Sequence, residues 1–419
     1  MNPNTSNNIS FTNTILFSNS DLFTSPVITM DVAPKDKWYL IYITLILHGL
    51  GTLTAWNMFI TAKDYFVKYK LANAQNFAEH YLTYVGWASQ LPNLGFSWAN
   101  VFVRIGGNLT TRIVWSLFGE VVIFLITVFL AMLDSSGWPV AFFWLTMISV
   151  FFLNAFNAIF QNSVYGVAAR LPPKYIGAVV LGSNVCGTLV VFLQWMSDLF
   201  DSPRTSATYY FMGGMFVLIM CFDTYYALPL NVSIFNRPKK RRSHATHPPY
   251  GTIFKQSWIQ LYNIFIVFFV SLSVFPAVHS GKPGFLGKNF VRLTCFLTFN
   301  FTAMIGSITA SCWRFPQPKW LFLFTTIRLV FIPFYLLCNY KPETRTLPVI
   351  IASDWVYWIG AVLMGWSSGH GSTLGMMYVG STVATEHAST AGMIGAAMLI
   401  TGIFTGITFS RICPIIVTM

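Results

Sequence analysis

Charged residues are scarce in this chain. They make up 9% of its 419 residues, and only 13 residues are Asp or Glu, whereas a soluble domain carries about 25% charged residues. Hydrophobic residues account for 55%, and the mean hydropathy is +0.59. This composition excludes a soluble domain of useful size and predicts that almost all of the 47.2 kDa chain is embedded in a lipid bilayer.

Motifs of metal binding and of catalysis are missing as well. The six cysteines lie in or beside apolar stretches without metal-type spacing, which is typical of small buried apolar residues. They are Cys186, Cys221, Cys295, Cys312, Cys338 and Cys413. The apolar stretches contain no paired aspartates, no Ser/His arrangement and no metal-ligand cluster. We therefore expect no enzyme, no metal and no cofactor.

The N-terminus has no basic segment followed by an apolar one, so no cleavable signal is expected. It is rich in Asn, Ser and Thr instead, and residues 1–37 are predicted to form a disordered tail.

The basic residues lie between the apolar stretches, and the formal net charge is +12. The densest cluster runs from Arg237 to Arg242. Dispersed charge of this kind is typical of loops that face the cytoplasm and touch anionic lipid, and it argues against a nucleic-acid partner.

The chain has about eleven stretches long and apolar enough to span a membrane. They are 38–62, 81–103, 111–133, 139–170, 174–198, 207–229, 257–279, 290–312, 319–338, 349–377 and 388–412. The polar, basic segment 230–256 divides them into six and five. The predicted organisation is thus a tail (1–37), an N-terminal bundle (38–229), a cytoplasmic linker (230–256) and a C-terminal bundle (257–419). The Lys and Arg bias places the N-terminus in the cytoplasm, and an odd number of spans then places the C-terminus outside.

Amide and hydroxyl side chains recur at helical spacing within several of these stretches. One stripe is Gln90, Asn93, Ser97 and Asn100, another is Asn154, Asn157, Gln161 and Tyr165, and Asn300 and Ser307 lie seven residues apart. Each such residue could serve hydrogen bonding between helices. Stripes on several helices favour a shared cavity for a neutral polar solute, with Trp56 as a flat apolar surface. His48 and His370 leave proton coupling open as an alternative.

Six segments resemble the equilibrative nucleoside transporters. Residues 49–66 contain Ala55-Trp56-Asn57 where that family usually has Pro-Trp-Asn. The other segments are Gln161-Asn-Ser-Val-Tyr-Gly166 with Leu171-Pro172, Phe275-Pro-Ala-Val278, Cys295-Phe-Leu-Thr-Phe-Asn300, Arg328-Leu-Val-Phe-Ile-Pro333 and Glu386-His-Ala-Ser-Thr-Ala-Gly392. The resemblance implies an all-α, major-facilitator-like fold of eleven helices, six plus five. It also implies alternating-access exchange of purine and pyrimidine nucleosides, which we expect of a monomer in the plasma membrane.

The resemblance also implies a site. Residues matching Leu53, Trp56, Gln90 and Gln161 line the central cavity in the family, and the one matching Gln161 bonds the base. Asn157 stands where mammalian members commonly have glycine. The family's ribose-binding Asp and Arg correspond here to Ala303 and Ser307. We therefore expect Asn300 and Ser307 to supply polar contacts instead. Nucleobases or organic cations remain alternative substrates.

Overall fold

The computed structural model describes residues 36–103, 107–227, 248–275, 277–279, 290–341 and 344–418. Most of the predicted tail, and most of the predicted linker with its basic cluster, lie outside these residues. α10 begins at Tyr250, inside the segment predicted as the end of the linker.

Long helices account for most of the described residues. The first six are α1 (Leu40–Thr61), α4 (Tyr81–Phe102), α5 (Leu109–Met132), α6 (Pro139–Ala168), α7 (Pro173–Ser197) and α8 (Pro203–Ala227). The remainder are α10 (Tyr250–Val274), η4 (Val291–Leu297) continued by α12 (Thr298–Cys312), α13 (Leu321–Ile327) continued by η5 (Arg328–Val330) and α14 (Phe331–Leu337), α15 (Asp354–Val379) and α16 (Ala388–Ser410). Short helices include α2 (Lys63–Tyr65), α3 (Gln75–Glu79) and α17 (Cys413–Thr418).

The predicted all-α membrane fold is confirmed. Each of the eleven predicted stretches coincides with helix in the described residues. Eight of those helices are long and apolar enough to cross a membrane. For α4, α15 and the segment Leu321–Leu337, membrane crossing remains a prediction.

Prolines fix several helix boundaries. α6, α7 and α8 begin at Pro139, Pro173 and Pro203, because the first helical position needs no N–H and favours the φ angle of proline. Pro333 lies inside the ninth helical segment and has no N–H to offer the carbonyl four residues earlier. The segment accordingly tightens to a 3₁₀ turn at Arg328–Val330.

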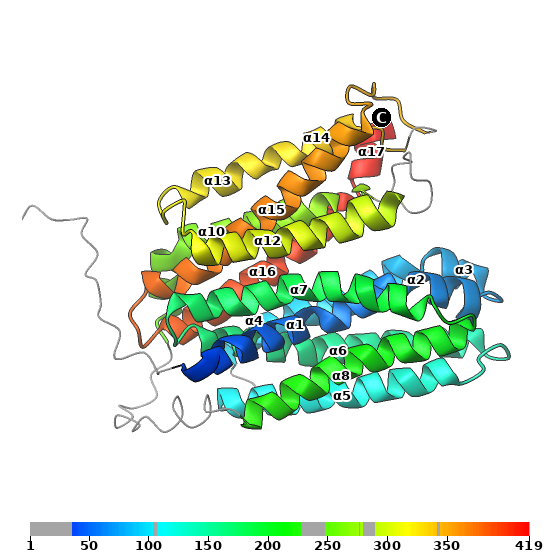
Figure 1. Cartoon of the computed structure of the whole chain (residues 1–419), viewed down its shortest axis with the longest axis horizontal. Helices are drawn as coiled ribbons and strands as arrows, with labels where there is room; N and C mark the ends of the chain where they lie inside the picture. Colours follow the sequence, from blue (N-terminus) through cyan, green and yellow to red (C-terminus); the bar gives the residue numbers. More distant parts are fainter. Residues whose placement is uncertain are drawn as a thin grey trace, which may run out of the picture. The chain divides into compact units, whose positions relative to one another are not determined.

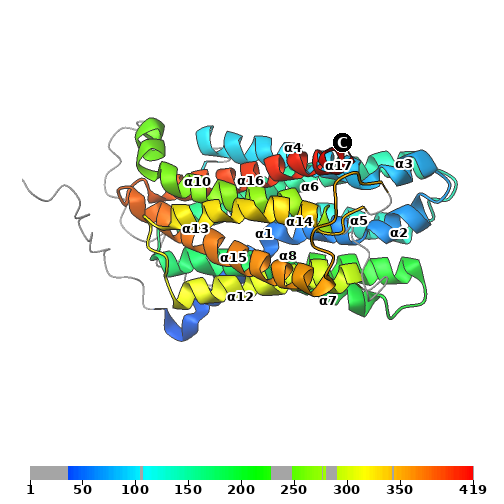
Figure 2. The ribbon, with the colours of Figure 1, turned by 90° about the horizontal axis from the view of Figure 1, so that it is seen from above.

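The helices form two groups that meet along a seam. The first group is α1 and α4–α8, and the second is α10 and α12–α16, because α16 packs mainly on α10. Figure 1 shows the first group in the lower part and α10 and α12–α15 in the upper part, with α16 between them. α7 packs against α12 and α15, and α16 packs against α4 and α6. Seen from above, the long helices keep a common direction (Figure 2).

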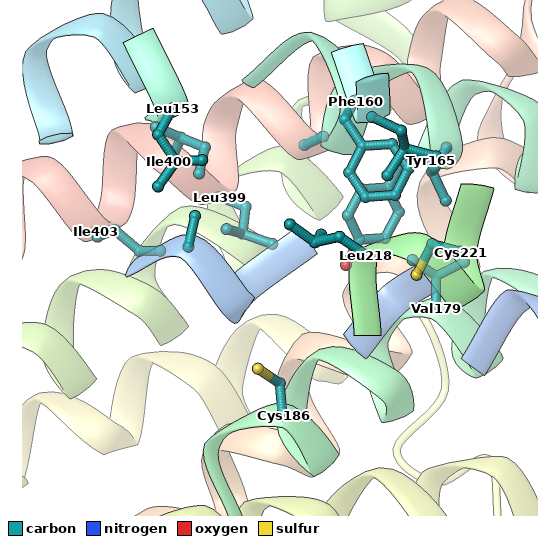
Figure 3. Close-up of a cluster of buried hydrophobic side chains, with 14 of the residues drawn as sticks. Leu153, Phe160, Tyr165, Val179, Cys186, Leu218, Cys221, Leu399, Ile400 and Ile403 are labelled. Atoms are coloured by element: carbon teal, nitrogen blue, oxygen red, sulfur yellow. The ribbon is translucent and has the colours of Figure 1, made fainter. Parts of the chain in front are cut away.

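Apolar packing continues across the seam. Leu153, Phe160, Leu218 and Ile400 belong to one buried cluster, drawn in Figure 3, although they come from α6, α8 and α16. The first helix group and α16 therefore share a core.

Glycines allow pairs of helices within a group to approach backbone to backbone. A Cβ at Gly182 of α7 would lie 1.9 Å from the Ile46 carbonyl oxygen of α1, and one at Gly49 would lie 2.0 Å from the Val179 oxygen. α12 and α15 approach in the same way, since a Cβ at Gly369 would lie 1.8 Å from the Ala303 oxygen. These positions accept no side chain unless a helix moves.

We predict that Gly182→Ala destabilises the protein, because the new methyl group forces α1 from α7 at a cost of roughly 1–3 kcal/mol. Gly95→Ala is the matched control, since a Cβ at Gly95 of α4 meets nothing within 4 Å. Thermal unfolding in detergent should show a lower Tm for Gly182→Ala and an equal or higher Tm for Gly95→Ala. Equal Tm values for the two variants would contradict the close approach.

Candidate functional site

A cavity of about 460 Å³ lies between the two helix groups, at the end of the bundle that carries the C-terminus. Its walls come from the C-terminal ends of α1, α7, α10 and α16 and from the N-terminal ends of α4 and α8. Because neighbouring helices alternate in direction, all these helix ends meet at one side. The volume lies within the range of pockets for small molecules.

The lining combines aromatic rings with hydrogen-bonding groups. Trp56 and Trp195 stand on the first group's side, and Phe296 stands on the other. Gln194 contributes an amide whose Nε2 donates to Asp198 Oδ1 at 2.9 Å. That bond fixes the amide, so the Gln194 oxygen remains an acceptor at the wall. Rings and amides together suit a flat polar solute.

Two charged residues line the cavity, and both are positive. Lys63 follows the end of α1, and Arg411 follows the end of α16. No Asp or Glu of the described residues belongs to the lining. A cationic solute would therefore meet like charge at this wall.

The seam is closed toward the opposite end by neutral hydrogen bonds. Asn162 Nδ2 of α6 donates to the Met393 oxygen of α16 at 3.2 Å. The Tyr250 hydroxyl of α10 donates to the Val101 oxygen of α4 at 3.0 Å. Nearer the middle, Trp98 Nε1 donates to Thr401 Oγ1 at 3.0 Å. The cavity is thus open at one end and sealed at the other.

Of the seven residues predicted to contact a solute, Trp56 lines this cavity. Leu53 lies one turn before it on α1 and is partly exposed. Gln90, Asn157 and Gln161 are buried, and none of them belongs to the lining. The structure therefore brings Trp56 to the cavity and keeps these three amides in the protein interior.

The three buried amides have hydrogen-bonding capacity left over. Gln90 Oε1, Gln161 Oε1 and both polar atoms of the Asn157 amide have no hydrogen-bond partner among the described residues. Buried amides are normally satisfied. By contrast, Asn100 of the same α4 stripe accepts from Arg112 Nη1 at 3.0 Å and so supports the helix packing. The stripes thus contain both structural amides and amides that are free to bind a polar guest.

Asn300 and Ser307 contact α7 across the seam. The Asn300 amide rests on α7, because a Cβ at Gly187 would lie 2.1 Å from its Oδ1. Ser307 Oγ accepts from Asn184 Nδ2 at 2.7 Å and from Thr373 Oγ1 at 3.0 Å. Ser307 therefore ties α12 to both α7 and α15 and does not line this cavity.

The contact between α12 and α15 contains the two uncharged positions, Ala303 and Ser307. A Cβ at Gly306 would lie 2.1 Å from the Trp366 oxygen, and Gly369 approaches Ala303 as described above. Ala303 and Ser307 are both buried in this contact. Small neutral side chains fit two backbones this close, whereas an unpaired buried charge would be costly.

Sequence reasoning missed the wall residues near the helix ends, among them Gln194, Tyr210 and Arg411. They form no stripe along a helix, because each helix contributes only its last or first turns. The sequence signal available for Gln194 and Arg411 was a single amide or arginine within an apolar stretch.

Comparison with known proteins identifies relatives of this chain. The family model described as nucleoside transporter matches residues 147–247 and 234–414. The chain is 28% identical to human Equilibrative nucleoside transporter 2 over 450 residues, covering 90% of this chain and 97% of the relative. It is 27% identical to rat Equilibrative nucleoside transporter 3 over 427 residues, covering 89% and 88%.

Among solved structures, the proton:xylose symporter XylE of the major facilitator superfamily superposes with a TM-score of 0.59. The two sequences are 12% identical, and the match covers 89% of each chain. A likeness at this identity concerns the fold.

We predict that a cysteine at the cavity wall reacts faster with a charged thiol reagent than a cysteine in the sealed seam. In purified protein carrying Cys312→Ser, which removes an exposed thiol, Gln194→Cys should be labelled rapidly. Thr373→Cys, at a fully buried position, should be labelled at least about tenfold more slowly because local opening must precede reaction. Equal labelling rates would contradict the one-sided opening.

Proposed function

We infer that this chain, which belongs to the nucleoside transporter family, is an equilibrative carrier that moves nucleosides across a membrane. It is a transporter and not an enzyme. The observation that carries this conclusion is the family match over most of the C-terminal two-thirds of the chain, together with relatives named equilibrative nucleoside transporters along 88% or more of their length. The cavity between the helix groups is where such a solute would enter.

We propose that transport proceeds by alternating access. The first helix group (38–229) and the second (257–419) would rock against each other, with the linker 230–256 between them. The present arrangement is then the state that is open at the C-terminal end. Closing that end would require α7 to approach α10 and η4, whose residues Leu272 and Phe296 form the facing wall.

The seven predicted residues form our proposed binding path. Trp56 would stack against the base at the cavity wall, and Leu53, one turn earlier on α1, would pack against the base as it moves inward. Gln90, Asn157 and Gln161 would then engage the base, because their buried amides have unused hydrogen-bonding capacity. Asn300 and Ser307 would bond the sugar once the contact between α7 and α12 loosens.

The orientation and setting are also proposals. Loops at the open end would face the extracellular side of the plasma membrane if the N-terminus is cytoplasmic, as the Lys and Arg bias predicts. We propose a monomer as the working unit. Neutral nucleobases are compatible with the same amides, whereas organic cations would be opposed by Lys63 and Arg411.

The function is tested by uptake of radiolabelled uridine and adenosine into proteoliposomes that contain the purified protein. We expect saturable uptake that equalises the inner and outer concentrations, without a sodium or proton gradient. Protein-free liposomes serve as the control. Uptake no faster than in those liposomes would refute the proposal, and accumulation driven by an imposed pH gradient would replace equilibrative transport by proton coupling.

Gln161 is tested by truncation. We predict that Gln161→Ala raises the KM for adenosine roughly tenfold, because the base loses about one net hydrogen bond. Gln75→Ala, at an exposed position of α3, is the matched control and should transport normally. A normal KM in Gln161→Ala at equal protein abundance would remove this residue from the binding path.

A further inference from the structure

The charged part of the cavity wall suggests a second chemical group that the site can hold. This inference rests on the proposed function, because it concerns the same cavity. Lys63 enters the cavity wall from the first helix group and Arg411 enters it from α16.

Trp87 of α4 fixes the position of the Arg411 guanidinium. The guanidinium carbon lies 4.8 Å from the centroid of the Trp87 ring. The nearest heavy atom to a Cβ built at Gly86 would be Arg411 Nη2, at 3.9 Å. Gly86 is itself a wall residue, so the arginine head lies beside the wall and packs on the Trp87 ring.

The contact with Trp87 leaves the arginine's donors available. A guanidinium contacts a ring through its face, while its N–H donors point outward in its own plane. Within the described residues, neither the Arg411 guanidinium nor the Lys63 ammonium has a hydrogen bond or an ion pair. Among the described side chains, the Asp198 carboxylate is bonded to the wall residue Gln194, and it is exposed. Water and salt screen an exposed carboxylate.

The surrounding wall suits the remainder of a nucleotide. Trp56 and Trp195 supply flat surfaces for a base, and Gln194 supplies a fixed amide. A guanidinium fork together with an ammonium is the donor set that proteins use for phosphate groups.

We propose that Lys63 and Arg411 form an anion subsite at the mouth of the cavity, which takes the phosphate of a nucleoside monophosphate while the base occupies the aromatic wall. Nucleoside monophosphates then bind at the mouth and compete with nucleosides for entry.

The experiment measures binding of radiolabelled uridine monophosphate and of uridine to the purified protein, and it does not depend on transport. The readout is the ratio of the two dissociation constants, which cancels any general change in the cavity. Arg411→Gln and Lys63→Gln should each raise the ratio of the uridine monophosphate constant to the uridine constant by about tenfold, because each loses a charge-assisted contact to phosphate. Arg411→Lys should have an intermediate effect, because it keeps the charge and loses the fork.

Lys255→Gln is the matched control. Lys255 is an exposed basic residue near the start of α10, far along the helix from the cavity-lining Leu272, so its loss changes the net charge equally and should leave the ratio as in the parent protein. Raising the salt concentration should weaken binding of uridine monophosphate more than that of uridine.

Three results would overturn the subsite: no binding of uridine monophosphate to the parent protein, the same ratio in Arg411→Gln and Lys63→Gln as in the parent, or an equal change in Lys255→Gln. Binding of uridine monophosphate that depends on Arg411, in a protein that takes up no uridine into proteoliposomes, would support the subsite and refute the carrier function. The two failures are therefore distinguishable.

Discussion

The seam between the two helix groups is closed over only part of its length, and the cavity exists because of that. Where the seam is closed, the polar contacts across it are neutral hydrogen bonds, such as Asn162 to Met393 and Asn184 to Ser307. Each contributes only about 0.5–1.5 kcal/mol net. Breaking them leaves no unpaired ion in the bilayer, where charge is expensive. A seam of this kind can separate and re-form at low cost, which alternating access requires.

The contacts within each group differ from those across the seam. Within a group, several glycines meet backbone atoms, as in α1 with α7, α12 with α15, and α10 with α16, where a Cβ at Gly402 would lie 2.6 Å from the Phe265 oxygen. Across the seam, glycines mostly meet flexible side chains: Gly166 faces Met393 and Gly177 faces Met377. Gly392 is an exception, because a Cβ there would lie 2.8 Å from the Tyr165 backbone oxygen and 2.5 Å from Ala169 Cβ. Backbone contacts resist sliding, whereas methionine side chains can repack. Sliding is therefore resisted most in the three helix pairs where glycines meet backbone, and at Gly392.

The sequence was sufficient to predict the helices and much less of the cavity. Apolar length marked helices that the structure contains. Helical spacing showed that Gln90, Asn93, Ser97 and Asn100 share a face, but spacing cannot tell which neighbour that face meets. Asn100 proved to serve packing with Arg112, while the Gln90 oxygen was left without a partner. The wall residues lie at helix ends that come together only in the folded bundle, and which end is open depends on the conformation rather than on a local pattern.

The distribution of charge connects these observations. Charged side chains at positions 303 and 307 of α12 would be buried in the contact among α7, α12 and α15, where this chain has Ala303 and Ser307. Such charges would have to be desolvated there, whereas Asn184 and Ser307 form a neutral contact. The two charged residues of the cavity lining, Lys63 and Arg411, are exposed at the mouth, where water can solvate them. A solute would then meet charge while it is still hydrated and amides once it is enclosed. Binding becomes a sum of several weak contacts, so the solute can leave on either side, as passive exchange requires.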